Sequence, residues 1–109
     1  MKLQMGATLQ NGKYQLNQVL VQESLGATYL ATQTLLQQPV VIKTIDPSLQ
    51  ITQTFPQLKT RFTEETRLLA RCQHPSIVRV LDFFQEDGLP FLVMEYIPGQ
   101  TLFDIFDAR

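Results

Sequence analysis

The sequence predicts an α+β fold, an antiparallel sheet of five strands with one main helix packed on it. Three features of the 109-residue chain support this prediction. Short segments rich in apolar and β-branched residues alternate with polar breaks, which is typical of strands. One longer segment, between the third and fourth of these, has the periodicity of a helix. The breaks between consecutive strands are short, which favours antiparallel neighbours.

The expected strands are bounded by turn-forming residues. Asn11-Gly12 precedes the first strand, Glu86-Asp87-Gly88 forms a hairpin turn between the last two, and Pro98-Gly99 ends the last. The strands are expected at 14–21, 27–31, 39–45, 78–85 and 90–96. The ten or so residues before the first strand carry little pattern, and we expect them to lie loosely against the body.

The main helix is expected over residues 56–73. One face of this helix is formed by positions at alternating steps of four and three residues: Leu58, Phe62, Glu65, Leu69 and Cys72. His74-Pro75 should end the helix, because a proline disfavours helical geometry in the residue before it. A short C-terminal helix should begin at Thr101, which stands three residues before Asp104 with the spacing of an N-terminal cap.

The composition indicates a soluble globular domain, with 44% hydrophobic and 17% charged residues. A net charge of -1 gives no electrostatic reason to expect nucleic acid or a membrane surface as partner. No apolar run is long enough for a membrane span, and the N-terminus lacks the apolar core of a secretory signal. The chain has a single cysteine, Cys72, and cannot form an internal disulfide, so we expect a cytoplasmic location. The Cys72 thiol is expected to be buried and inert. His74 is expected to cap the helix, and no metal-ligand cluster is present.

Two charged residues interrupt the hydrophobic pattern with opposite signs. Lys43 falls in an otherwise apolar strand, where it shares a face with Val41 and Ile45. Glu65 falls on the helix face that is expected to dock on the sheet. A buried charge is costly unless it is paired, so the two side chains are expected to meet, with the lysine holding an anion. The alternative is that both reach solvent at the rim of the sheet.

Several short motifs in this order resemble those of the protein kinase family. The segment 40–43, Val-Val-Ile-Lys, resembles the lysine motif of the third kinase strand, and Glu65 falls where the family places the glutamate of its central helix. Leu20, Gly26 and the segment 28–31 resemble the glycine-rich hairpin of the same fold. No single motif is specific, but together they indicate a protein kinase N-terminal lobe.

The resemblance extends to the end of the chain. Residues 74–80 resemble the connection from the central helix to the fourth strand, and residues 92–102 resemble the fifth strand and the hinge. The expected division is an N-terminal extension at 1–13, the lobe at 14–97, and the hinge with the start of the next helix at 98–109. The resemblance implies the ATP-binding lobe of a Ser/Thr-type kinase of bacterial or eukaryotic-like kind, truncated before the second lobe.

The resemblance also implies which residues contact ATP. Lys43 would bind the α- and β-phosphates, and Glu65 would hold Lys43 in place. The other positions implied to contact the nucleotide are Leu20, Gly26, Thr28, Val41, Met94, Glu95, Ile97 and Thr101. The Mg²⁺ ligands and the catalytic base would belong to the second lobe, so this fragment by itself should be inactive.

The chain departs from the family pattern in the hairpin. The pattern G-x-G-x-x-G requires glycine at positions 21 and 23, but the chain has Val21 and Glu23, and only Gly26 remains. The missing glycines would let the backbone approach the phosphates, and the Glu23 carboxylate would repel them. The grip on the phosphates should therefore be weaker than the adenine contacts.

Three functions remain open on the sequence. The first is the nucleotide-binding half of an active Ser/Thr kinase that phosphorylates protein hydroxyls. The second is a pseudokinase or regulatory scaffold that binds a protein partner, with weak nucleotide binding or none. The third is a kinase-like module within a larger multidomain sensor. Because an isolated lobe exposes apolar residues such as Met94, Tyr96 and Phe103, we also expect self-association.

Overall fold

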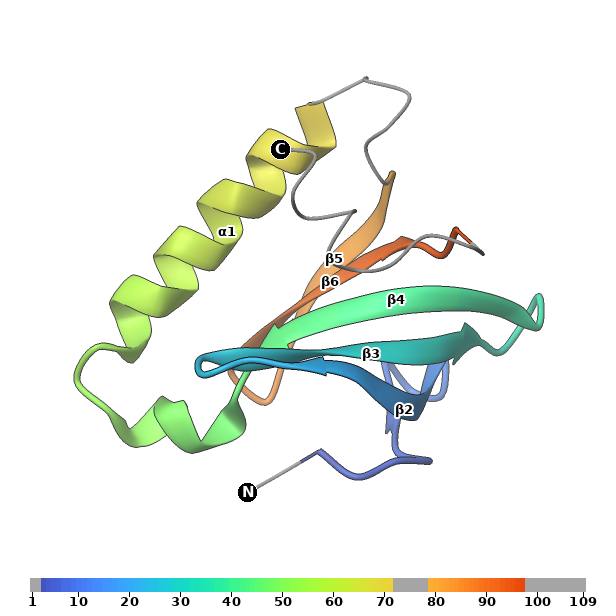
Figure 1. Ribbon diagram of the computed structural model, residues 1–109, viewed down its shortest axis with the longest axis horizontal. Helices are drawn as coiled ribbons and strands as arrows, with labels where there is room; N and C mark the ends of the chain where they lie inside the picture. The colour runs from blue at the N-terminus through green and yellow to red at the C-terminus, as the bar shows by residue number, and fades with distance from the viewer. Residues whose placement is uncertain (1–2, 72–78, 98–109) are drawn as a thin grey trace.

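The computed structural model describes residues 3–71 and 79–97. Within these ranges six strands form one antiparallel sheet in the order β1-β2-β3-β4-β6-β5, with a long helix against one side (Figure 1). The elements are β1 (Thr8–Leu9), β2 (Tyr14–Gln22), β3 (Gly26–Gln33), β4 (Gln38–Ile45), the short 3₁₀ helix η1 (Pro47–Ile51), α1 (Phe55–Arg71), β5 (Val80–Glu86) and β6 (Leu89–Glu95). The predicted α+β class, the five strands and the main helix are confirmed.

The sixth strand corrects the sequence-based expectation for the N-terminus. In β1, Thr8 pairs with Gln15 and Leu9 pairs with Tyr14, and the Leu9 side chain is buried in the core. The expectation that these residues lie loosely against the body is therefore wrong. A strand of two residues is too short to show the alternation by which strands are found in a sequence.

The sheet buries apolar side chains on both of its faces. The larger cluster includes Leu16, Tyr29, Ile42, Phe91 and Val93. The smaller cluster consists of Val41, Leu92 and Met94, with Leu20, Phe62, Leu69 and Val80 among the side chains packed against it. β4 explains the division, because successive strand residues point to opposite faces: Ile42 joins the larger cluster and Val41 the smaller one.

Side chains join the two ends of this sheet. The Tyr14 hydroxyl on β2 donates a 2.9 Å hydrogen bond to the carboxylate of Asp82 on β5, and Lys13 Nζ lies 3.4 Å from the same oxygen. The Gln10 amide donates to the carboxylate of Glu86 at 2.8 Å. Since β2 and β5 are separated by three strands in the sheet order, these bonds require the sheet to curl toward closure.

α1 begins at Phe55, where the Thr54 carbonyl accepts a hydrogen bond from the Leu58 amide. Pro56 stands in the first turn, where its missing N–H has no helical partner to lose. The predicted packing face is confirmed for Leu58 and Phe62, which pack against the larger cluster. The predicted end of the helix falls in residues 72–78, outside the described residues, and so do Cys72 and His74.

Candidate functional site

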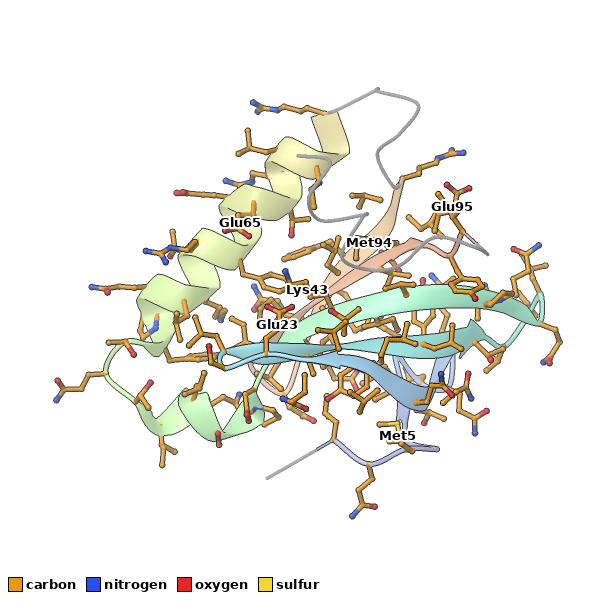
Figure 2. The ribbon with its side chains drawn as sticks, in the orientation of Figure 1. Met5, Glu23, Lys43, Glu65, Met94 and Glu95 are labelled. Carbon is orange, nitrogen blue, oxygen red and sulfur yellow. The ribbon has the colours of Figure 1, made fainter. Side chains whose placement is uncertain are left out.

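Lys43 and Glu65 line the same pocket between the sheet and α1. Both side chains are half-buried, and they project from β4 and α1 into the space between helix and sheet (Figure 2). The pocket encloses about 260 Å³, and Ile45 and Phe62 also line it. The structure therefore brings together the two charges that interrupt the hydrophobic pattern.

An apolar surface adjoins Lys43 on the same face of the sheet. Strand register places Val41 beside Met94, and both are buried in the smaller cluster. Leu20 from the neighbouring hairpin packs against this cluster, as does Ile97 after β6. Predicted nucleotide positions from β2, from β4 and from the end of β6 thus lie on one face, which is apolar at one end and carries Lys43 at the other.

Thr28 supplies a polar atom on this face. Thr28 lies directly opposite Lys43 in the pairing of β3 with β4, and it is completely buried. Its hydroxyl has no hydrogen-bond partner among the described residues. A buried hydroxyl without a partner is costly, so Thr28 is an unfavourable polar group beside Lys43 on this face.

The hairpin between β2 and β3 gives Gly26 a structural role. The Glu23 amide donates to the Gly26 carbonyl at 2.8 Å, and the Asp46 amide donates to the Leu25 carbonyl at 2.9 Å. A Cβ atom at position 26 would overlap the carbonyl oxygen of Thr44 on the paired strand β4. The close backbone approach that requires this glycine is therefore to a neighbouring strand.

Glu23 lies at the tip of this hairpin and lines the same pocket as Lys43 and Glu65 (Figure 2). Its side chain is exposed. Arg61 also lines the pocket, so two carboxylates and two cations surround it. Arg61 was not predicted from the sequence, although its position four residues before Glu65 places both on one face of α1.

The remaining predicted positions lie near or beyond the end of β6. Glu95 is the last residue of β6, and its amide donates to the Arg79 carbonyl at 2.9 Å, so this N–H is already used within the sheet. Thr101 lies outside the described residues. Met94, which was expected on an exposed apolar face, is buried, because Val41 and Leu92 pack around it.

Comparison with known proteins settles the family. Residues 14–109 match the protein kinase domain. The chain belongs to the protein kinase family. It is 34% identical over 106 residues to Serine/threonine-protein kinase PksC of Streptomyces coelicolor, covering 94% of this chain and 18% of that protein. It is 31% identical over 99 residues to Probable serine/threonine-protein kinase YbdM of Bacillus subtilis, covering 91% of this chain and 38% of that protein.

Solved structures support the same fold. The kinase domain of Mycobacterium tuberculosis PknI superimposes with a TM-score of 0.62 at 28% identity, covering 89% of this chain and 38% of that one. A structure described as the apo form of PpkA-294 superimposes with a TM-score of 0.79 at 23% identity, covering 99% of this chain and 43% of that one, and shows the fold alone. The chain thus spans less than half the length of each of these four chains.

Membership of the family implies the use of ATP and Mg²⁺. Among the described residues, no group of three or more His, Cys, Asp or Glu side chains is arranged to hold a metal ion. None of the helices in residues 3–71 and 79–97 is long and apolar enough to cross a membrane.

Proposed function

We propose that this chain is the ATP-binding N-terminal lobe of a Ser/Thr protein kinase, with the nucleotide held on the face of the sheet that carries Lys43. The observation that carries the proposal is the pocket shared by Lys43 and Glu65, next to an apolar surface on the same face. A nucleotide has the same division into a flat apolar base and a charged phosphate chain.

The apolar end of the surface suits the base. Val41, Met94 and Leu20 would contact the two flat faces and the inner edge of the adenine. The carbonyl of Glu95 and the backbone of Ile97 would form hydrogen bonds with its polar edge. Thr28, which is completely buried in β3, would support the roof from within the sheet. Burial of the base would supply most of the affinity, because apolar contact area is the dominant favourable term in such sites.

The charged end would hold the phosphates. The Lys43 ammonium offers three N–H donors to the α- and β-phosphate oxygens, and Glu65 would keep that ammonium in position. Bound Mg²⁺ would neutralise part of the phosphate charge. Phosphoryl transfer to a protein hydroxyl is assigned to the longer kinase of which this lobe would form part, with the catalytic base and metal ligands in the second lobe.

One observation favours a second candidate, a pseudokinase or regulatory scaffold. Glu23 places a carboxylate at the pocket where the family pattern has glycine, and Val21 replaces another glycine. Like charges repel, so this hairpin opposes a triphosphate. A scaffold would keep the fold and bind a protein partner without needing the nucleotide.

Titration of Mg·ATP into the chain, followed by NMR amide shifts, tests the proposal. Shifts at Lys43, Met94 and Ile97 are expected in the wild type and should be much smaller in Lys43→Met. Lys59→Met is the matched control, because Lys59 is a half-buried lysine of α1 that lines a different pocket, and it should respond like the wild type. If a longer protein containing both lobes gives no shifts at millimolar nucleotide, the ATP-binding proposal fails and the scaffold is favoured.

A further inference from the structure

A second pocket lies on the opposite flank of α1, between the helix and β5. It encloses about 470 Å³, and its lining includes Phe55, Lys59, Thr63, Glu64, Arg67 and Gln85. We call it the α1–β5 groove. No residue of this groove lines the pocket of Lys43, so the groove is separate from the proposed nucleotide site.

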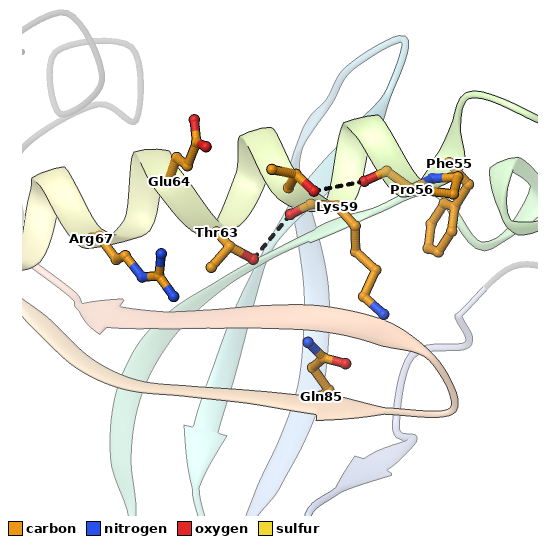
Figure 3. A pocket seen from close by; sticks show the side chains of 8 residues that line it. Phe55, Pro56, Lys59, Thr63, Glu64, Arg67 and Gln85 are labelled. Atoms are coloured by element: carbon orange, nitrogen blue, oxygen red, sulfur yellow. Dashed lines mark hydrogen bonds between the residues drawn. The ribbon is translucent and has the colours of Figure 1, made fainter.

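The helix period creates one polar wall of the groove. Lys59, Thr63 and Arg67 stand four residues apart, so they lie one above another along α1. Figure 3 shows all three projecting toward β5, where Gln85 faces them. Glu64 projects to the other side of the helix in the same view. The wall of α1 that faces β5 therefore carries two cations, while Glu64, which also lines the groove, points away from β5.

The two cations are available to a ligand. Within residues 3–71 and 79–97, neither Lys59 nor Arg67 forms an ion pair. Arg67 is exposed and Lys59 is half-buried, with Phe55 buried at the same end of the groove. Cations held along a concave surface attract groups of opposite charge.

The spacing of the cations indicates the shape of the ligand. Eight residues of α-helix separate the attachment points of Lys59 and Arg67 by about 12 Å. In an extended peptide, side chains four residues apart lie on one face and are separated by about 13 Å. Two carboxylates at that spacing can therefore reach both cations together.

The groups between the cations suit a peptide backbone. The Gln85 side-chain amide can donate and accept, and the Thr63 hydroxyl, which donates to the Lys59 carbonyl at 2.9 Å, keeps lone pairs to accept an N–H. We propose that the α1–β5 groove binds an extended acidic segment of a partner protein, with two carboxylate side chains four residues apart on Lys59 and Arg67. This binding does not depend on the nucleotide.

Fluorescence anisotropy with a labelled peptide tests the proposal. The probe is an extended peptide of about seven residues with two aspartates four positions apart and threonine or valine elsewhere. It is expected to bind the wild-type chain at low salt, and each of Lys59→Gln and Arg67→Gln should weaken binding roughly three- to tenfold. Added salt should weaken binding further, because part of the attraction is screened.

Two controls make the result decisive. Arg61→Gln removes the same charge from the same helix outside the groove, and it should change the affinity less than about twofold. Circular dichroism would establish that each variant is folded. Equal weakening by all three substitutions, equal binding of a peptide with asparagines in place of the aspartates, or no binding of the aspartate peptide to the folded chain would each overturn the proposal.

Discussion

The hydrogen bond between Tyr14 and Asp82 should hold the curled sheet together, and Tyr14→Phe tests this directly. The Tyr14 ring stacks on Phe84 with ring centroids 5.9 Å apart, and a phenylalanine can keep that contact. The substitution therefore removes only the hydroxyl, which donates at 2.9 Å to the Asp82 carboxylate. A hydrogen bond to a charged group contributes about 1.5–3 kcal/mol.

The structure favours the lower end of that range. The Asp82 side chain is 30% exposed, so water can replace part of the lost bond, and its other oxygen still accepts from the Phe83 amide at 2.8 Å. We expect Tyr14→Phe to lower the free energy of unfolding by about 1.5 kcal/mol. At about 4–8 °C per kcal/mol for a domain of this size, the melting temperature should fall by roughly 6–12 °C.

The pH dependence gives an independent check. Burial, followed by the Asp82 carboxylate, raises the pKa of Tyr14 from 10.0 to about 12. Tyr14 therefore ionises at a lower pH in the unfolded chain than in the folded chain. The stability that Tyr14 contributes below pH 10 is lost as the pH rises toward 12. The stability difference between wild type and Tyr14→Phe should shrink across that interval.

Urea denaturation followed by circular dichroism measures these differences, with Asp82→Ala and the double variant completing a double-mutant cycle. The two single substitutions should not be additive, because they remove the same interaction. If Tyr14→Phe lowers the free energy of unfolding by less than about 0.5 kcal/mol, or if the effects in the cycle are additive, this bond does not hold the curled sheet together.

Three further results are expected. Gly26→Ala should destabilise the chain by about 1–3 kcal/mol in thermal unfolding, because its Cβ would meet the Thr44 carbonyl oxygen, and an unchanged melting temperature would contradict this. Glu23→Gly should tighten Mg·ATP binding, measured by calorimetry, by roughly two- to tenfold at low salt and less at high salt; equal affinities would show that the carboxylate does not oppose the phosphates. Light scattering is expected to show self-association through apolar residues such as Tyr96, and a monomer at every concentration would exclude it.

Within the described residues, the sequence by itself determined five of the six strands, the main helix and the central pair of charges. Strand and helix periods are local properties of the chain, and they placed Lys43 on one face of a strand and Glu65 on the docking face of a helix. A helix packed on that strand brings the two side chains to one pocket in this structure. The strand ends depend on hydrogen bonds of single residues, and the pattern located them less closely; the 3₁₀ helix η1 was not predicted.

The tertiary structure decided what lies together across long separations. Asp82 interrupts an apolar strand in the sequence, and only the curl of the sheet shows that it meets Tyr14, 68 positions earlier. The same holds for Gly26, where a glycine is needed because the Thr44 backbone of the paired strand comes too close for a Cβ atom. It also holds for the α1–β5 groove. These features depend on the twist and curvature of the whole sheet, which no short segment encodes, and so the sequence pattern could not reveal them.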